Sequence, residues 1–261
     1  HGRRLSGPFG DEGIAGSFLG KFLFLGVLSI IYTNLSSRYI LLILLIGIPI
    51  VILTNERSIS IMYSFSTLVF IILHNNSLKK KLILVSFIVI GVLTLITSNE
   101  KIQNHFINQP LEYFKDNHHK AHFLTASEIY KDNIFLGSGI KSFRHVCKNI
   151  KYENINSKYF NNRCSTHPHN IYLEIISETG LAGFIFFILL NLYILFFFAK
   201  NMFIVRNKNY REILVIFCMF VILFWPLQTT GAFFSTWNGI FYWINLSFIF
   251  YLRSKSAIKP I

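Results

Sequence analysis

The chain has 261 residues, of which 52% are hydrophobic and 16% aromatic, and its formal net charge is +13. Soluble domains are seldom this apolar, so the composition argues against a soluble enzyme and indicates a polytopic membrane protein. The apolar runs also leave little room for the basic face that a nucleic-acid-binding domain needs, and we expect no nucleic-acid partner.

Seven apolar runs are candidates for membrane-spanning helices, and a glycine-rich polar loop, residues 1–16, precedes the first of them. The runs are 18–33, 39–53, 59–73, 82–97, 181–199, 213–227 and 239–252. We therefore expect an all-α fold, a transmembrane helical bundle of about seven spans. The chain starts at His1, not Met, and we expect it to be the C-terminal portion of a longer protein.

One long polar segment, residues 98–170, separates the fourth run from the fifth. Within it, residues 122–130 have helical spacing of apolar side chains, and Gly137 to Gly139 favours a turn. The sequence therefore divides into 1–97, with four spans, 98–170, a large and partly helical loop, and 171–261, with three spans.

Basic residues in the short loops fall on one side of this bundle. They are Arg38, Lys79, Lys80, Lys81, Lys200, Arg206, Lys208, Arg211, Arg253, Lys255 and Lys259. The positive-inside rule makes that side cytoplasmic and places the long polar segment outside; long loops are exempt from the rule. The ten basic residues of that segment, Lys115 among them, would then bind an anionic ligand or anionic lipid headgroups, or form a solvated charged surface.

The stretch His167 to Gly183, HPHNIYLEIISETGLAG, ends where the fifth apolar run begins. Its histidines therefore lie just outside the membrane. An imidazole that exchanges a proton near neutral pH can act there as a general base. Interfacial loop histidines that only bind water fit the same spacing.

The pattern His169-Asn170, nine residues, Gly180, two residues, Gly183 resembles the signature of the O-antigen ligase and O-antigen polymerase superfamily. Four further stretches resemble this family in the same order: RRLSGPFGDEGIAGSFL, the Glu-Arg-Ser break at 56–58, IYKDNIFLGSGIKSFRHVC and CSTHPHN. The chain departs in having Glu56 where Ser is common, and Ile134 or Phe135 where a proline often precedes the glycine turn. The resemblance covers essentially the whole chain.

This resemblance implies a multi-pass glycosyltransferase of the bacterial inner membrane whose active site faces the periplasm. Its donor would be a glycan on undecaprenyl diphosphate, its acceptor lipid A-core or another glycan, and membrane lipids would surround it. Further spans would precede His1. A ligase of lipopolysaccharide biosynthesis is the first hypothesis and a polymerase of lipid-linked repeat units the second. A transporter of lipid-linked sugar, which should show charged or broken helices at mid-bilayer, and a protein-glycosylating oligosaccharyltransferase stay open.

Such a transfer needs a base for the acceptor hydroxyl and cations for the departing diphosphate. His169, the histidine at the signature position, is the expected catalytic base. Arginine pairs phosphate oxygens bidentately, and Arg57 at the outer end of the third run is the first candidate. Arg163, Arg144 and Arg4 are the second candidates. A snorkelling anchor or a solvated charge is the alternative for each arginine.

Several neighbours have expected supporting roles. Asn170 should cap the following helix, and Gly180 and Gly183 should let helices approach closely. Glu178 either orients His169 or is an interfacial carboxylate. The other nearby histidines are expected at the surface and not as catalysts: His118, His119, His122 and His167. Of these, His167 is also expected to support the site. We expect no cofactor and no metal, because no Cys/His ligand pattern and no DxD-like carboxylate pair near the outer face appear.

The three cysteines differ in their surroundings. Cys147 and Cys164 lie in the long outer segment, and because the periplasm is oxidising we expect them to form a disulfide. Cys218 lies inside the sixth apolar run and should stay a free thiol.

Overall fold

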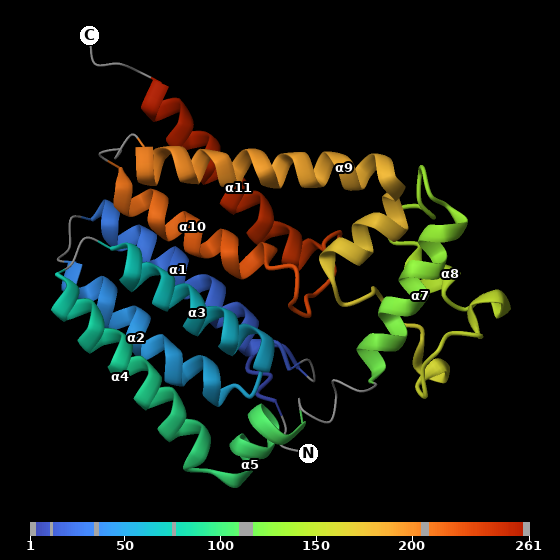
Figure 1. Ribbon diagram of the computed structural model, residues 1–261, viewed down its shortest axis with the longest axis horizontal. Coiled ribbons are helices and arrows are strands. Elements are labelled where there is room, and N and C mark those ends of the chain that lie inside the picture. The colour runs from blue at the N-terminus through green and yellow to red at the C-terminus, as the bar shows by residue number, and fades with distance from the viewer. Residues whose placement is uncertain are drawn as a thin grey trace. The chain divides into compact units, whose positions relative to one another are not determined.

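The computed structural model describes residues 4–10, 13–33, 37–74, 77–109, 117–204 and 209–257 (Figure 1). Helices are the only regular secondary structure in these ranges, which confirms the all-helical class. Lys115, Arg206, Lys208 and Lys259 lie outside the described residues.

The chain forms two compact units that cut across the three segments drawn from the sequence. Unit 1 comprises His1–Pro110, Phe198–Leu223 and Asn245–Ile261, and unit 2 comprises Leu111–Phe197 and Phe224–Ile244.

Unit 1 is built mainly from four apolar helices, shown in blue to teal in Figure 1. They are α1 (Ala15–Tyr32), α2 (Ser37–Leu53), α3 (Arg57–Leu73) and α4 (Leu78–Thr97), and the short turns α5 (Glu100–Gln103) and η1 (Asn104–Asn108) follow them. In the core between α1 and α3, the rings of Phe24 and Tyr63 meet edge to face with centroids 5.4 Å apart. Most of α10 (Tyr210–Phe224) also belongs to this unit.

Three described helices are long and apolar enough to cross a bilayer: α1, α4 and α9 with its extension, Ile171–Ile204. Helices α2 and α3 are apolar but shorter. On α4, Ile88 is buried, whereas Phe87 is 65% and Ile90 64% exposed. An apolar face this open suits contact with lipid. The structure therefore has the helices expected of a membrane protein, and the count of seven spans stays a prediction.

Unit 2 contains most of the polar segment, from residue 111 onward. Helix α7 (His118–Asp132) covers the helix expected at 122–130, and the Asn117 side chain caps it by accepting from the Lys120 amide at 2.8 Å. The short turns α8 (Phe143–Val146), η2 (Ile150–Tyr152) and η3 (Phe160–Asn162) pack beside it. Their shared apolar core consists of Ala126, Ile129, Phe143, Cys147 and Tyr152.

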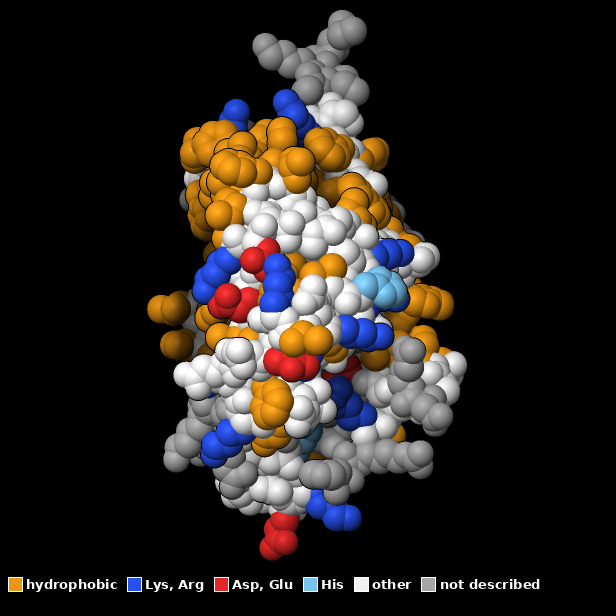
Figure 2. All heavy atoms as spheres, turned by 90° about the vertical axis from the view of Figure 1, so that its right-hand side faces the viewer, with side chains coloured by type: hydrophobic (Ala, Val, Ile, Leu, Met, Phe, Trp, Pro, Cys, Tyr) orange, Lys and Arg blue, Asp and Glu red, His pale blue; other side chains and the backbone are white. Residues whose placement is uncertain are grey.

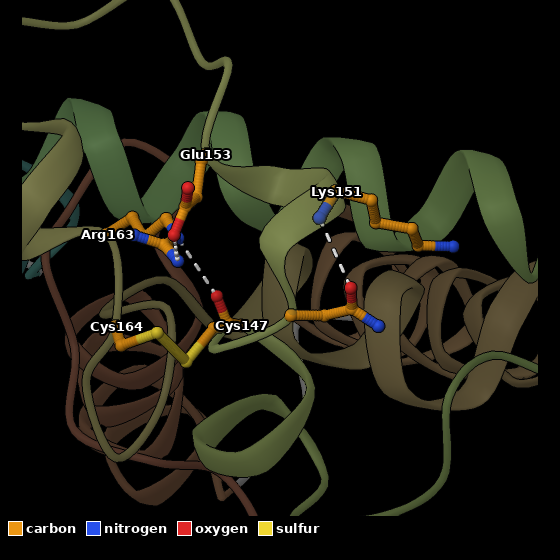
Figure 3. A network of polar contacts seen from close by, with 6 residues as sticks. Cys147, Lys151, Glu153, Arg163 and Cys164 are labelled. Atoms are coloured by element: carbon orange, nitrogen blue, oxygen red, sulfur yellow. Dashed lines mark hydrogen bonds and ion pairs between the residues drawn. A yellow bond between two sulfur atoms is a disulfide. The ribbon is translucent and has the colours of Figure 1, made fainter.

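A disulfide between Cys147 and Cys164 joins α8 to the loop after η3 (Figure 3). Closing a loop of this size stabilises a fold by about 3 kcal/mol in the chain-entropy description. Cys147 is fully buried in the core of unit 2, so the bond also holds residues 163–170 close to α8. Cys218 is a buried free thiol.

Helix α9 (Ile171–Ala199) is broken at Gly180, whose φ of 65° is left-handed. The break frees backbone groups on both sides, and the turn after α7 satisfies them. The amides of Leu181 and Ala182 donate to the carbonyls of Ile134 and Phe135, at 2.7 and 3.2 Å. A side chain at position 180 would collide with the backbone of Phe135, so only glycine fits.

The reverse exchange completes this junction. The amides of Ser138 and Gly139 donate to the carbonyls of Ser177 and Glu178, at 3.0 and 2.9 Å. The Gly137–Gly139 turn expected from the sequence therefore binds the broken helix through backbone hydrogen bonds. It fixes the first part of α9, which follows the histidine motif directly. The π-helical turn η4 (Lys200–Ile204) continues the second part, and α11 (Thr236–Ala257) ends the described chain.

Candidate active site

His169 has a left-handed backbone, with φ of 60°. Few residues other than glycine adopt this conformation, and they persist in it only where their surroundings hold them. The His169 carbonyl accepts from the Thr230 amide at 2.8 Å, and the ring Nε2 lies 3.0 Å from the Ser165 hydroxyl. One contact therefore holds the His169 backbone and the other orients its ring.

Asn170 anchors the residue that follows. Its Oδ1 accepts from the amides of Tyr172 and Leu173, at 3.0 and 3.1 Å, and so caps α9. Its Nδ2 donates to the Pro226 carbonyl at 2.8 Å. One side chain thus fixes the start of α9 against the loop between α10 and α11.

His167 is buried, so its expected surface position is wrong. Its Nε2 lies 3.0 Å from the Thr230 carbonyl and its Nδ1 2.9 Å from the Thr166 hydroxyl. A carbonyl only accepts, so Nε2 carries the proton and Nδ1 accepts from Thr166. Burial lowers the pKa of His167, and the nearby Arg144 charge lowers it further. His167 is therefore a neutral anchor for the motif.

Three histidines from two distant parts of the sequence meet beside this anchor. His119 and His122 lie on α7, and one ring nitrogen from each lies within 4.8 Å of the others and of a His169 nitrogen. The centroid of the His169 ring is 5.1 Å from the centroids of both other rings. Their spacing of three residues puts His119 and His122 on one helix face, which is the signal that could have indicated the pair.

His122 is only 7% exposed, which makes its expected surface position wrong as well. It lies on the inner face of α7 together with Ala121, Thr125 and Ala126. Burial lowers the pKa of His122, against a bond to the Asn162 backbone that raises it. His119 is partly buried, and His118 is exposed beside the Tyr159 ring.

Two buried glutamates on the first part of α9 hold loops. Glu178 accepts from the amides of Lys141 and Phe143, at 2.6 and 3.1 Å. Glu174, one turn earlier, accepts from the amide of Phe233 at 2.8 Å. Both oxygens of Glu178 thus bind backbone near α8. Glu174 was not among the residues expected from the sequence.

The two arginines of unit 2 have different surroundings. Arg163 donates from Nε to the Cys147 carbonyl and from a terminal nitrogen to Glu153, both at 3.1 Å (Figure 3). Arg144 is exposed on α8. The face that carries α7 and α8 shows cationic and anionic side chains interspersed (Figure 2). Arg163 is thus a structural partner of the disulfide loop, and Arg144 is available to a solute.

Arg57 and Arg4 belong to unit 1. Arg57 is half-buried at the start of α3, and Arg4 is exposed. Both lie near His105, whose Nε2 is 3.0 Å from the carbonyl of Asn55, a residue with φ of 62°. Burial, then Arg57, and to a smaller extent Arg4 lower the pKa of His105. His105 was not among the site residues expected from the sequence.

The carboxylate of Glu56, the residue before Arg57, holds the start of α1. It accepts from the amide of Gly16 at 2.5 Å and from the hydroxyl of Ser17 at 2.8 Å. The Glu-Arg-Ser break thus positions Arg57 through a carboxylate that is tied to the neighbouring helix.

Comparison with known proteins gives one family. A family model described as O-antigen ligase matches residues 40–188, which are 149 of the 261 residues. No curated protein and no solved structure matches the chain. The matched range contains His169, Arg57, Arg144 and Arg163, whereas Arg4 lies outside it. Because this range is more than half of the chain, the protein belongs to the O-antigen ligase family.

Proposed function

We propose that this protein transfers a glycan from undecaprenyl diphosphate to a sugar hydroxyl, as a ligase that acts on lipid A-core. Membership of the O-antigen ligase family supports a lipid-linked glycan as substrate, and the long apolar helices support a membrane location. The basic short loops support an inner-membrane orientation with the active site on the periplasmic side. A polymerase that joins lipid-linked repeat units is the second candidate, because the same family matches both.

His169 is the proposed general base, and its left-handed, doubly anchored conformation is the observation that carries the proposal. Its lone pair takes the acceptor hydroxyl proton while that oxygen bonds to the anomeric carbon of the donor. The bond from this carbon to the diphosphate oxygen breaks, and the carrier diphosphate leaves. If Ser165 accepts the Nε2 proton, Nδ1 carries the lone pair that acts.

Arg57 is the proposed diphosphate-binding residue. Arg4 adds positive charge in the same group. A guanidinium pairs two phosphate oxygens at once, and the fixed start of α3 limits the freedom that binding must remove. Arg144, which is exposed, is a further candidate for contact with the glycan or the diphosphate.

The substitution His169→Ala tests the base. Loss of a general base typically lowers the rate about 100- to 10,000-fold. The assay is glycan transfer by purified full-length protein with a lipid-linked donor, and the control is His145→Ala, an exposed histidine on α8. Wild-type transfer should also slow toward acid pH, because imidazolium has no lone pair. Near-normal turnover by His169→Ala would return this histidine to a structural role.

Arg57→Lys tests the diphosphate proposal separately. A point charge does not replace the planar fork, so we expect a higher KM for the lipid-linked donor. Arg211→Lys, an exposed arginine at the start of α10, is the matched control. An unchanged KM in Arg57→Lys would remove this role and leave the base assignment intact.

The glycan profile of cells that lack the gene separates the two candidate reactions. A ligase defect should leave finished polymer on the carrier and none on lipid A-core. A polymerase defect should leave single repeat units attached to core. The second pattern would replace the ligase proposal by the polymerase.

A further inference from the structure

The cluster of His119, His122 and His169 has the donor set of a transition-metal site. All three candidate ligand atoms are imidazole nitrogens, and they lie within 4.8 Å of one another. A tetrahedral zinc ion with Zn–N bonds of about 2.0–2.1 Å needs its nitrogens about 3.3 Å apart. The rings therefore need to close inward by roughly 1.5 Å at most to reach that separation.

His122 provides the second observation. Its Nδ1 is buried and makes no hydrogen bond to any described residue. The ring also bonds to the Asn162 backbone, and that bond must use the other nitrogen, Nε2. A metal-binding histidine usually donates its remaining N–H to a carbonyl or carboxylate, which fixes the tautomer and leaves the lone pair for the metal. His122 has this arrangement.

His169 has a comparable arrangement. Its Nε2 lies 3.0 Å from the Ser165 hydroxyl, and its ring centroid lies 5.1 Å from the ring centroids of His119 and His122 on α7. His119 and His169 are both partly exposed, so an ion can reach the cluster from solvent. The ring centroid of His167 lies 4.2 Å from that of His169, but both nitrogens of His167 already have partners.

We propose that His119, His122 and His169 form a binding site for a divalent transition-metal ion of the zinc class. Three nitrogens leave the fourth tetrahedral position open to water or to an oxygen of a solute. An all-imidazole donor set selects zinc, copper or nickel over magnesium and calcium, which prefer oxygen ligands.

The site has a consequence for His169. A metal ion takes the lone pair that the proposed transfer needs, so zinc and proton abstraction exclude each other at this residue. Zinc should therefore inhibit glycan transfer reversibly. This consequence rests on the proposed function, whereas the metal site itself does not.

The test of the site is a binding measurement on the full-length protein in detergent, after chelator treatment. Zinc is titrated against a chromophoric chelator, and cobalt, whose visible spectrum reports tetrahedral nitrogen ligation, is the second probe. We expect one zinc ion per chain and a tetrahedral cobalt spectrum. Magnesium and calcium should not displace either metal.

The substitutions His122→Ala and His119→Asn should each weaken zinc binding by about 100-fold or more. His118→Ala on the same helix and His145→Ala on α8 are the matched controls and should bind as the wild type does. Circular dichroism and the intact Cys147–Cys164 disulfide report that each variant is folded. Absent zinc binding in the wild type, or equal affinity in folded His122→Ala and His119→Asn, would overturn the site.

The transfer assay with added zinc distinguishes the two proposals. Inhibition in the wild type that is relieved by chelator and is much weaker in His119→Asn supports both. Stoichiometric binding with undiminished transfer supports the metal site and removes His169 as the base. Inhibition that is equal in His119→Asn and the wild type would mean that zinc acts elsewhere, and would overturn this mode of inhibition.

Discussion

Three described residues other than glycine have positive φ, and each stands at a candidate residue or its support. His169 is the proposed base. The Asn55 carbonyl lies within hydrogen-bond distance of the His105 ring, and the Lys141 amide donates to Glu178. Left-handed backbone at such residues costs of order 1–3 kcal/mol and persists only where neighbours over-determine it. In each case a neighbouring residue of the same unit holds the backbone in this conformation.

His105 should make stability depend on pH. Its folded pKa is lowered, chiefly by burial and then by Arg57, from the unfolded value of about 6.5. Below pH 6.5 the unfolded chain therefore binds the proton first, and folding free energy is lost as pH falls toward the lowered value. The thermal midpoint in detergent should drop between pH 7.5 and 5.5 and drop less in His105→Gln.

His145→Gln is the control for this measurement, because His145 is exposed on α8. Its pH profile should match that of the wild type. Some dependence should remain in His105→Gln, because His122 and His167 also have lowered pKa values. Identical profiles for His105→Gln and the wild type would contradict the assignment.

At the scale of elements, the break in α9 separates two tasks of one helix. The part before Gly180 presents Glu174 and Glu178, whose carboxylates hold the loops at Phe233 and at Phe143. The part after it is apolar and long enough to belong to a membrane span. The left-handed Gly180 lets the chain change direction between them.

Gly180→Ala should destabilise the protein strongly. Left-handed backbone at an alanine costs about 1–2 kcal/mol of conformational energy. The alanine Cβ would also collide with the backbone of Phe135 and Gly137. Gly91→Ala on α4 is the matched control, because a Cβ there meets nothing within 4 Å. We expect a lower thermal midpoint and poorer expression for Gly180→Ala. Gly91→Ala should be neutral or slightly stabilising, since alanine is the better helix former.

At the scale of the whole molecule, the proposed topology places the polar segment outside and Lys80 inside. A cysteine at Asn156, which is exposed in unit 2, should react with an impermeant thiol reagent in intact spheroplasts. A cysteine at the exposed Lys80 should react only after the membrane is opened. The native thiols add little background, because two form a disulfide and Cys218 is buried. The opposite labelling would invert the orientation.

The apolar helices were predictable because each is a long hydrophobic run that length and composition identify. The ends of these helices were less predictable. Helix α4 begins at Leu78, before the apolar run that starts at residue 82, because Ser77 caps the helix and the three lysines that follow Leu78 are helical. The sequence also predicted the helix at 122–130 and the glycine turn, whose residues carry local signals.

Long-range partners could not be predicted in the same way. The burial of His122, the bonds from Glu178 to Lys141 and Phe143, and the group of Arg57 with His105 all join residues distant in sequence or hidden by tertiary packing. Arg163 illustrates this limit: its charge suggested an anion site, whereas its neighbours give it a carbonyl and a carboxylate.

The junction between the broken helix and the turn before it also implies an order of assembly. Four backbone bonds join residues 134–139 to residues 177–182. Until the turn docks, the amides of Leu181 and Ala182 need water, since unpaired backbone is costly in hydrocarbon. We therefore expect the second part of α9 to reach its final position in a bilayer only after residues 140–176 have folded and brought the turn back to it. Folding of this loop would then control when the helix that follows it is fully inserted.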